Sequence, residues 1–291
     1  MNEISDVRPS PIAGQWYARN AAQLSDQVDG YMNAAELPDL EGDVVAVIAP
    51  HAGHVYSGPV AGYAFATLRE LSPQVVAVIS PMHHPYFEPL LTTSHAYYET
   101  PLGEIPVDCR ALDDLDKLLK EELGSGLRRV AYDQEHSLEI ELPFLQRALS
   151  KPFRLLPVMV REQSARVARA LGRSLARLVS PGCVLEDQEM ILVASTDLSH
   201  FYSQSVAVTL DKVMLRRVEE FDPEGVISTE ERGEGFACGR GAMAAVLWAA
   251  KELGADRAQV LNYATSGDVT GDYERVVGYA AAVITRQADV A

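Results

Sequence analysis

Residues 44–54 read VVAVIAPHAGH. The stretch opens as an unbroken apolar run rich in β-branched side chains, which is typical of a strand buried on both faces of a parallel sheet. Pro50 has no N–H for a sheet hydrogen bond and Gly53 permits a sharp turn, so the strand is expected to end there. His51 would then lie just past the carboxyl end of the strand, where open α/β sheets bind their ligands.

Two more stretches repeat this pattern. Residues 75–85 read VVAVISPMHHP and residues 190–200 read MILVASTDLSH. In each case a histidine follows the buried strand in the next loop. If the strands are parallel neighbours, these loops lie at the same edge of the sheet, and we expect a shared site there. The alternation of strand and helix segments, with no long linker, predicts a single α/β domain over residues 1–291. Its central sheet is expected to be mostly parallel or mixed, and flanked by helices.

Composition restricts the class of protein. The chain has 291 residues, a hydrophobic fraction of 47% and a formal net charge of −16. This charge disfavours binding to nucleic acid or to an anionic membrane, because both need clustered Lys and Arg. No apolar run approaches the length of about 20 residues that spans a bilayer, and no secretory signal pattern is visible. The three cysteines do not make a disulfide framework, so we expect a cytoplasmic protein.

Other segments give local expectations. Residues 1–20 are expected to form an extended arm that tucks one aromatic pair onto the body. Residues 97–103 are expected to form a loop, and a helix is expected to begin near Ser57. A further helix is expected to open after residue 133, which would place His136 and Glu139 on one helical face.

The residues at the strand ends have chemistry suited to a metal site. His51 is a candidate ligand, with a loop histidine bonded to a backbone carbonyl as the alternative. His83 and His84 are adjacent, so only one of them is expected to bind a metal, while the other would bind substrate or support the ligand. Asp197 could orient His200 as an acid–base pair. The alternative for that pair is a turn-capping Asp beside an unrelated exposed His.

Cys238 is predicted at the start of a helix, where free N–H groups and the helix dipole stabilise a thiolate. A thiolate is a nucleophile or a soft metal ligand, whereas a small buried thiol is the commoner fate of cysteine. Arg240 could hold an anion nearby. His136 could be a ligand, part of a proton relay or only a helix start. A Ser-His-Asp hydrolase is disfavoured, because no serine has a nucleophile-elbow pattern.

Six ordered segments resemble those of one known family. They are AGQWY (13–17), APHAG (49–53), PMHH (81–84), DQEHSLE (133–139), STDLSH (195–200) and CGR (238–240). In order and spacing they are similar to the Memo family, whose prokaryotic members are called AmmeMemoRadiSam system protein B. The resemblance covers nearly the whole chain, and the six segments together are highly specific.

The resemblance implies a fold like that of the LigB-type, class III extradiol dioxygenases, which hold Fe(II) with two histidines and a glutamate. Mapped by motif, the metal histidines fall on His51 and His83, and the acid/base histidine falls on His200, with Asp197 beside it. Cys238 falls on the carboxylate position. It replaces a hard oxygen ligand by a soft sulfur one, which favours copper or zinc while permitting iron. The residues expected to bind substrate are Trp16, His84, His136 and Arg240.

Two functions follow from this reasoning. One is a dioxygenase-like, non-heme iron oxidoreductase that acts on a small aromatic diol or a similar bidentate substrate. The other is a non-catalytic metal-binding or adaptor protein. Its partners would be an AMMECR-type protein and a radical SAM protein, as the family's system name implies.

Overall fold

A mixed sheet forms the centre of the computed structural model, which describes residues 5–287. The nine-stranded sheet has the order β10-β12-β2-β9-β3-β8-β4-β7, and β11 pairs with β12 off this path. Its strands are β2 (Asp43–Ala49), β3 (Val75–Pro81), β4 (Leu90–Thr93), β7 (Arg128–Val130), β8 (Arg154–Val160), β9 (Met190–Ser195), β10 (His200–Tyr202), β11 (Arg257–Thr265) and β12 (Val276–Arg286).

The inner strands run parallel. β9 lies between β2 and β3, and β8 follows β3, all in parallel pairing. β12 and β4 join this core antiparallel, so the sheet is mixed. The three apolar runs predicted to be buried strands are β2, β3 and β9, and every residue of β3 and β9 is buried. Because these three strands are parallel neighbours, the loops that follow them open on the same edge of the sheet.

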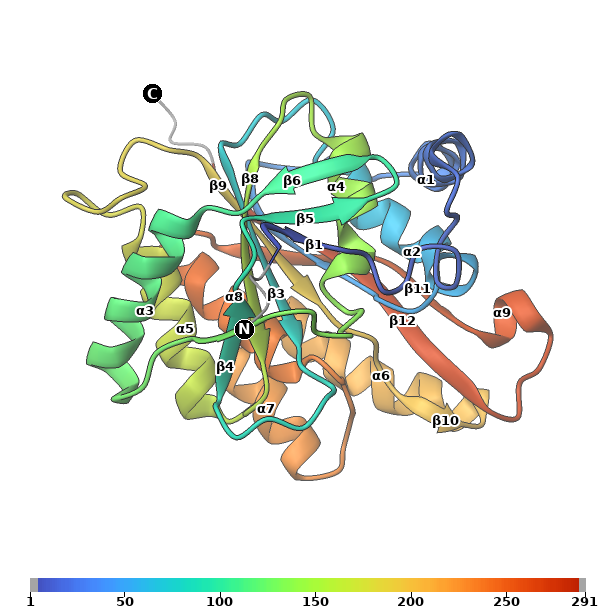
Figure 1. Ribbon diagram of the computed structural model, residues 1–291. Helices are drawn as coiled ribbons and strands as arrows, with labels where there is room; N and C mark the ends of the chain where they lie inside the picture. Colours follow the sequence, from blue (N-terminus) through green and yellow to red (C-terminus); the bar gives the residue numbers. More distant parts are fainter. Residues whose placement is uncertain (1–4, 288–291) are drawn as a thin grey trace.

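Helices cover both faces of this sheet, which confirms the predicted α/β architecture (Figure 1). α2 packs on β2 and β12, with α1 and α4 outside it, while α8 packs on the other face with α5 and α7. The helices are α1 (Ala21–Ala34), α2 (His54–Ala66), α3 (Cys109–Leu123), the 3-10 helix η1 (Glu139–Glu141), α4 (Leu142–Ala148), α5 (Ala165–Arg177), α6 (Gln204–Glu219), α7 (Pro223–Glu231), α8 (Arg240–Glu252) and α9 (Gly267–Thr270). None of the helices within residues 5–287 is both long and apolar enough to cross a membrane.

Three local expectations were wrong. Residues 97–103 are not a loop: β5 (Tyr97–Thr100) and β6 (Gly103–Pro106) form a hairpin, and β1 (Val7–Arg8) of the N-terminal arm pairs with β5. α2 begins at His54 rather than near Ser57, because the backbone N–H groups of residues 56 and 57 already bond to the carbonyl of Gly53. His136 lies in an irregular segment ahead of η1, so it shares no helical face with Glu139.

Candidate metal centre

Three histidines from distant parts of the chain meet at the shared edge of the sheet. His51 follows β2, His83 follows β3, and His136 lies between β7 and η1. One ring nitrogen from each lies within 4.8 Å of the other two. The ring of His83 stacks on that of His136, with 4.9 Å between centroids, and His51 meets both edge-on. Three imidazoles gathered this tightly could hold a metal ion.

The hydrogen bonds of His51 fix which of its nitrogens faces the group. Its Nδ1 lies 2.8 Å from Ser195 Oγ, and Ser195 donates its own hydroxyl proton to the carbonyl of Ser137 at 2.6 Å. The Ser195 oxygen can therefore only accept from His51, so Nδ1 carries the proton. The lone pair of His51 is then on Nε2, which is the nitrogen a metal ion needs.

Glu135 does the same for the other two rings. Its Oε1 accepts a hydrogen bond from His83 Nδ1 at 2.9 Å and lies 3.2 Å from His136 Nδ1. Its oxygens also accept from the backbone N–H groups of His83, His136 and Ser137. Burial alone would raise the pKa of Glu135, but the hydrogen bonds and the charge of His83 hold it well below its ordinary range. A carboxylate that orients metal-binding imidazoles in this way also raises their basicity.

Two of the three histidines have lowered pKa values. Burial, and then the neighbouring rings of His136 and His83, lower the pKa of His51 well below its ordinary value. Burial also lowers the pKa of His136 to about 4. His51 and His136 are therefore neutral near pH 7. A cation placed among the clustered ring nitrogens could accept their lone pairs. His83 is 36% exposed, so the group is open to solvent on one side.

Cys238 contacts one member of this group, His51, but its sulfur is not among the atoms that lie within 4.8 Å of one another. Its Sγ lies 3.1 Å from His51 Nε2 and accepts the backbone N–H of Asp197 at 3.2 Å. The helix expected to begin at Cys238 begins at Arg240 instead, with Gly239 as its cap. Burial, followed by the carboxyl of Asp197, raises the pKa of the Cys238 thiol well above its ordinary value. The predicted stabilisation of a thiolate by the helix dipole is thus outweighed by desolvation.

Asp197 and His200 are close in sequence but have separate partners. The carboxylate of Asp197 accepts the backbone N–H of His51 at 2.8 Å, and burial raises its pKa to about 7. Nδ1 of His200 lies 2.7 Å from the carbonyl of Leu198, which can only accept, so Nε2 of His200 is left with a lone pair. Asp197 therefore positions the loop that carries His51.

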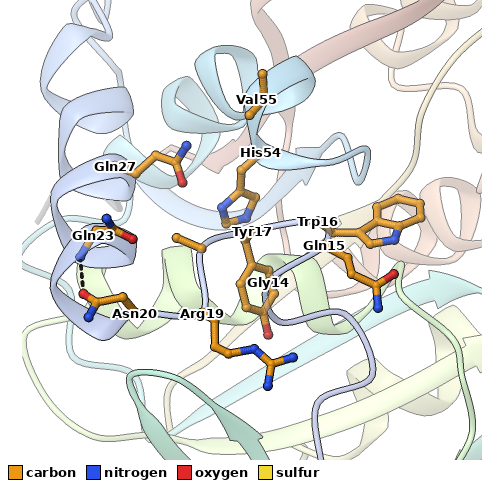
Figure 2. Close-up of a pocket in the computed structure, with 11 residues that line it drawn as sticks. Gly14, Gln15, Trp16, Tyr17, Arg19, Asn20, Gln23, Gln27, His54 and Val55 are labelled. Atoms are coloured by element: carbon orange, nitrogen blue, oxygen red, sulfur yellow. Dashed lines mark hydrogen bonds between the residues drawn. The ribbon is translucent and has the colours of Figure 1, made fainter.

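The residues expected to bind substrate lie in different settings. The ring of Trp16 lies against that of His136, with 4.1 Å between centroids and 31° between the ring planes, and so Trp16 adjoins the group. Figure 2 shows Trp16 turned away from Gln23 and Gln27 of α1, which face His54 across a neighbouring pocket. His84 is exposed beside His83. Arg240 is ion-paired with Glu230, and its Nε donates to the carbonyl of Gln163, so it is not brought to the three histidines.

Sequence reasoning missed the residues that hold the ligands in place. Glu135 and Ser195 sit inside the recognised motifs, but nothing in their spacing shows which nitrogen they contact. Arg8 was missed altogether. Its buried guanidinium bonds to both carboxylate oxygens of Asp133, at 2.8 and 3.0 Å, and to Glu139 at 2.5 Å. It also donates to the carbonyl of Glu135 at 2.9 Å, so the N-terminal arm anchors the segment that carries Glu135 and His136.

The chain is similar to known proteins over almost its full length. The family model described as "Memo-like protein" matches residues 8–283. A MEMO1 family protein of Nitrosopumilus maritimus is 33% identical over 280 residues, covering 94% of this chain and 98% of that protein. One of Methanosarcina mazei is 34% identical over 281 residues, covering 96% and 99%.

Among solved structures, an uncharacterized protein from Escherichia coli K12 matches with a TM-score of 0.53 and 14% sequence identity, covering 84% of this chain and all of that one. At that identity the likeness concerns the fold alone. The family model and the two relatives match almost the full length of this chain, and they therefore show which family it belongs to. The chain belongs to the Memo family.

Proposed function

We propose that the chain binds one transition-metal ion at this edge of the sheet and acts as an oxidoreductase on a small bidentate substrate such as an aromatic diol. His51, His83 and Cys238 would hold the ion, and His136 offers a further nitrogen. The observation that carries the proposal is the way Ser195 and Glu135 hold the three rings. Nδ1 of His51 and Nδ1 of His83 each have a hydrogen-bond acceptor, and Nδ1 of His136 lies 3.2 Å from Glu135, which would leave the Nε2 atoms available to an ion.

The donor set suits a borderline or soft ion. Imidazole nitrogen binds iron, copper and zinc, and sulfur shifts the preference toward copper and zinc. We propose Fe(II) because the motifs resemble those of iron enzymes, with copper or zinc as the alternatives. When bound, such an ion supplies Lewis acidity to the substrate oxygens and, if it is iron or copper, a redox couple.

The residues around the ion have their own tasks in this proposal. His200 would accept the substrate proton at Nε2, since its Nδ1 is engaged with a carbonyl. Burial lowers the pKa of His200, which keeps this base neutral near pH 7. Trp16 would cover His136 and exclude water on that side. Asp197 would keep His51 in place through its backbone N–H.

Metal content tests the first half of the proposal. Metal-free protein would be loaded with Fe²⁺ without oxygen, and in parallel with Cu⁺ and Zn²⁺, and its affinity measured by competition with a chelator. His51→Ala and His83→Ala should each weaken binding about 100-fold or more. His84→Ala is the matched control for metal binding, because His84 lies next to His83 outside the group. Equal affinity in all four proteins would contradict the proposal. His136→Ala and Cys238→Ala then show which of these two donors the ion uses.

Oxygen consumption tests the second half. The iron-loaded protein should take up O₂ with at least one catechol of a panel, and His200→Gln should slow that uptake without lowering iron content. The alternative function is a metal-binding adaptor, and two observations favour it: Cys238 stands where a carboxylate is expected, and Asp197 holds His51 rather than His200. A loaded protein that never consumes O₂ but co-purifies with an AMMECR-type or radical SAM protein would support that alternative.

A further inference from the structure

An aromatic cavity lies directly beside the candidate metal centre. It has a volume of about 460 Å³, and its walls include Trp16, Tyr56, Phe201 and Tyr279. The candidate ligands do not line it, but three lining residues neighbour the centre. Ala52 follows His51 in the chain, Phe201 follows His200, and the ring of Trp16 lies against that of His136. A volume of this size, with apolar walls and few polar groups, is typical of a pocket for a small molecule.

The backbone of Phe201, which lines this cavity, is strained. Its φ is +64°, in the left-handed region that residues with a side chain seldom adopt, and the pairing of β10 with β12 is irregular at this point. Such a conformation costs on the order of 1 kcal/mol for a residue other than glycine. Phe201 is nevertheless 62% exposed, so burial of its side chain does not explain the strain. A ring presented to a cavity in this way is suited to contact something that enters it.

One positive charge stands at this cavity. Arg275 lines it, and its guanidinium lies 5.4 Å from the centre of the Phe201 ring. Within residues 5–287 no carboxylate lies in ion-pair range of Arg275, although the chain as a whole carries a formal charge of −16. One carboxylate, Asp272, also lines the cavity, and it accepts the backbone N–H of Glu274 at 3.0 Å.

We infer that this cavity is the substrate pocket of the centre and that its occupant is a flat ring bearing a carboxylate, which Arg275 binds. Flat rings stack on Trp and Phe side chains, and a guanidinium on an aromatic face keeps its N–H groups free for an anion. Arginine also matches a carboxylate with two parallel hydrogen bonds. The inference rests on the proposed function, because it takes the metal centre to be what acts on the occupant.

A matched pair of ligands tests it. 3,4-Dihydroxybenzoate and 4-methylcatechol share the diol and the ring, and differ in the carboxylate. Calorimetric titration of the Zn²⁺-loaded protein should give an affinity about tenfold higher for 3,4-dihydroxybenzoate, the usual effect of one hydrogen-bonded charge pair. Arg275→Gln should remove this difference by weakening the benzoate alone, and Arg275→Lys should restore part of it. Arg128→Gln is the control, since Arg128 is an exposed arginine on β7, away from the cavity.

Equal affinities of the two ligands for the wild type would overturn the inference, as would a preference that survives Arg275→Gln. A third ligand separates this result from a failure of the metal proposal. 3,4-Dimethoxybenzoate keeps the ring and the carboxylate but cannot chelate, so it should bind the metal-free wild type and bind Arg275→Gln about tenfold more weakly. If the chain holds no metal but this difference remains, the anion pocket stands and the metal proposal falls. If the dimethoxybenzoate does not distinguish the two proteins, the pocket falls whatever the metal content.

Discussion

Replacing Glu135 by glutamine removes the one acceptor that serves two of the three histidines. The carboxylate accepts His83 Nδ1 at 2.9 Å and the backbone N–H of His83 at 2.6 Å, and it lies 3.2 Å from His136 Nδ1. A glutamine side chain turns one of its two acceptor oxygens into a donor. That NH₂ group would face N–H groups that now donate hydrogen bonds to Glu135. The rings of His83 and His136 would both lose the negatively charged group beside them.

The size of the effect follows from this geometry. Losing one group that orients a metal-binding histidine lowers metal affinity about 10- to 100-fold. Since Glu135 serves both His83 and His136, we expect the upper end of that range, about 3 kcal/mol of binding free energy. Competition with a chelator measures the affinity, and thermal unfolding of the metal-free variant shows that it remains folded.

Glu141 provides a matched control for this substitution. It is fully buried, and within the described chain neither of its carboxylate oxygens has a hydrogen-bond partner. Burial raises the pKa of Glu141 well above its ordinary value, which favours the uncharged carboxyl. An amide is nearly the same shape as a protonated carboxyl, and Glu141→Gln should keep the wild-type metal affinity. If Glu135→Gln also binds metal as tightly as the wild type while folded, the proposed role of the shared carboxylate is refuted.

Three further results are expected. Because burial raises the pKa of Cys238, a metal ion must displace its proton, so affinity should rise about tenfold per pH unit from about pH 6 to 8 and rise less steeply in Cys238→Ala, as competition titrations can measure. Arg8→Met leaves Glu139 buried without its cation and should cost about 3–5 kcal/mol in urea unfolding of the metal-free protein, and a loss below about 1 kcal/mol would refute the anchor. In Gly239→Ala the new Cβ would lie 2.4 Å from a backbone oxygen at the end of β9, so melting temperature and metal affinity should both fall. In the control Gly30→Ala, in α1, the new Cβ would have nothing within 4 Å, so the melting temperature should rise slightly.

The sheet could be predicted because its signal is local. The runs at 44–49, 75–79 and 190–194 are apolar without interruption, since both faces of these strands are buried. The hairpin at 97–106 gave no such signal. Its residues alternate between buried and exposed over only four positions, and its pairing with the N-terminal arm is a contact between distant parts of the chain.

The candidate site could be predicted in part for the same reason. Histidines just past buried strands are visible in the sequence, and parallel pairing brings His51 and His83 together. The position of His136 depends on a loop, and that loop is held by Arg8 from more than 120 residues away. Charge pairs of this kind have no periodicity that a sequence could reveal. The pKa of Cys238 was misjudged because desolvation depends on packing, which the motif does not contain.

The residues that would bind the metal are also far apart in the order of synthesis. His51 is synthesised early, and Cys238, whose sulfur lies beside its ring, follows 187 residues later. No ion could find its full set of donors on the growing chain, and Arg8 waits for its partners until residue 139 has emerged. A full set of donors therefore exists only once residue 238 has emerged from the ribosome.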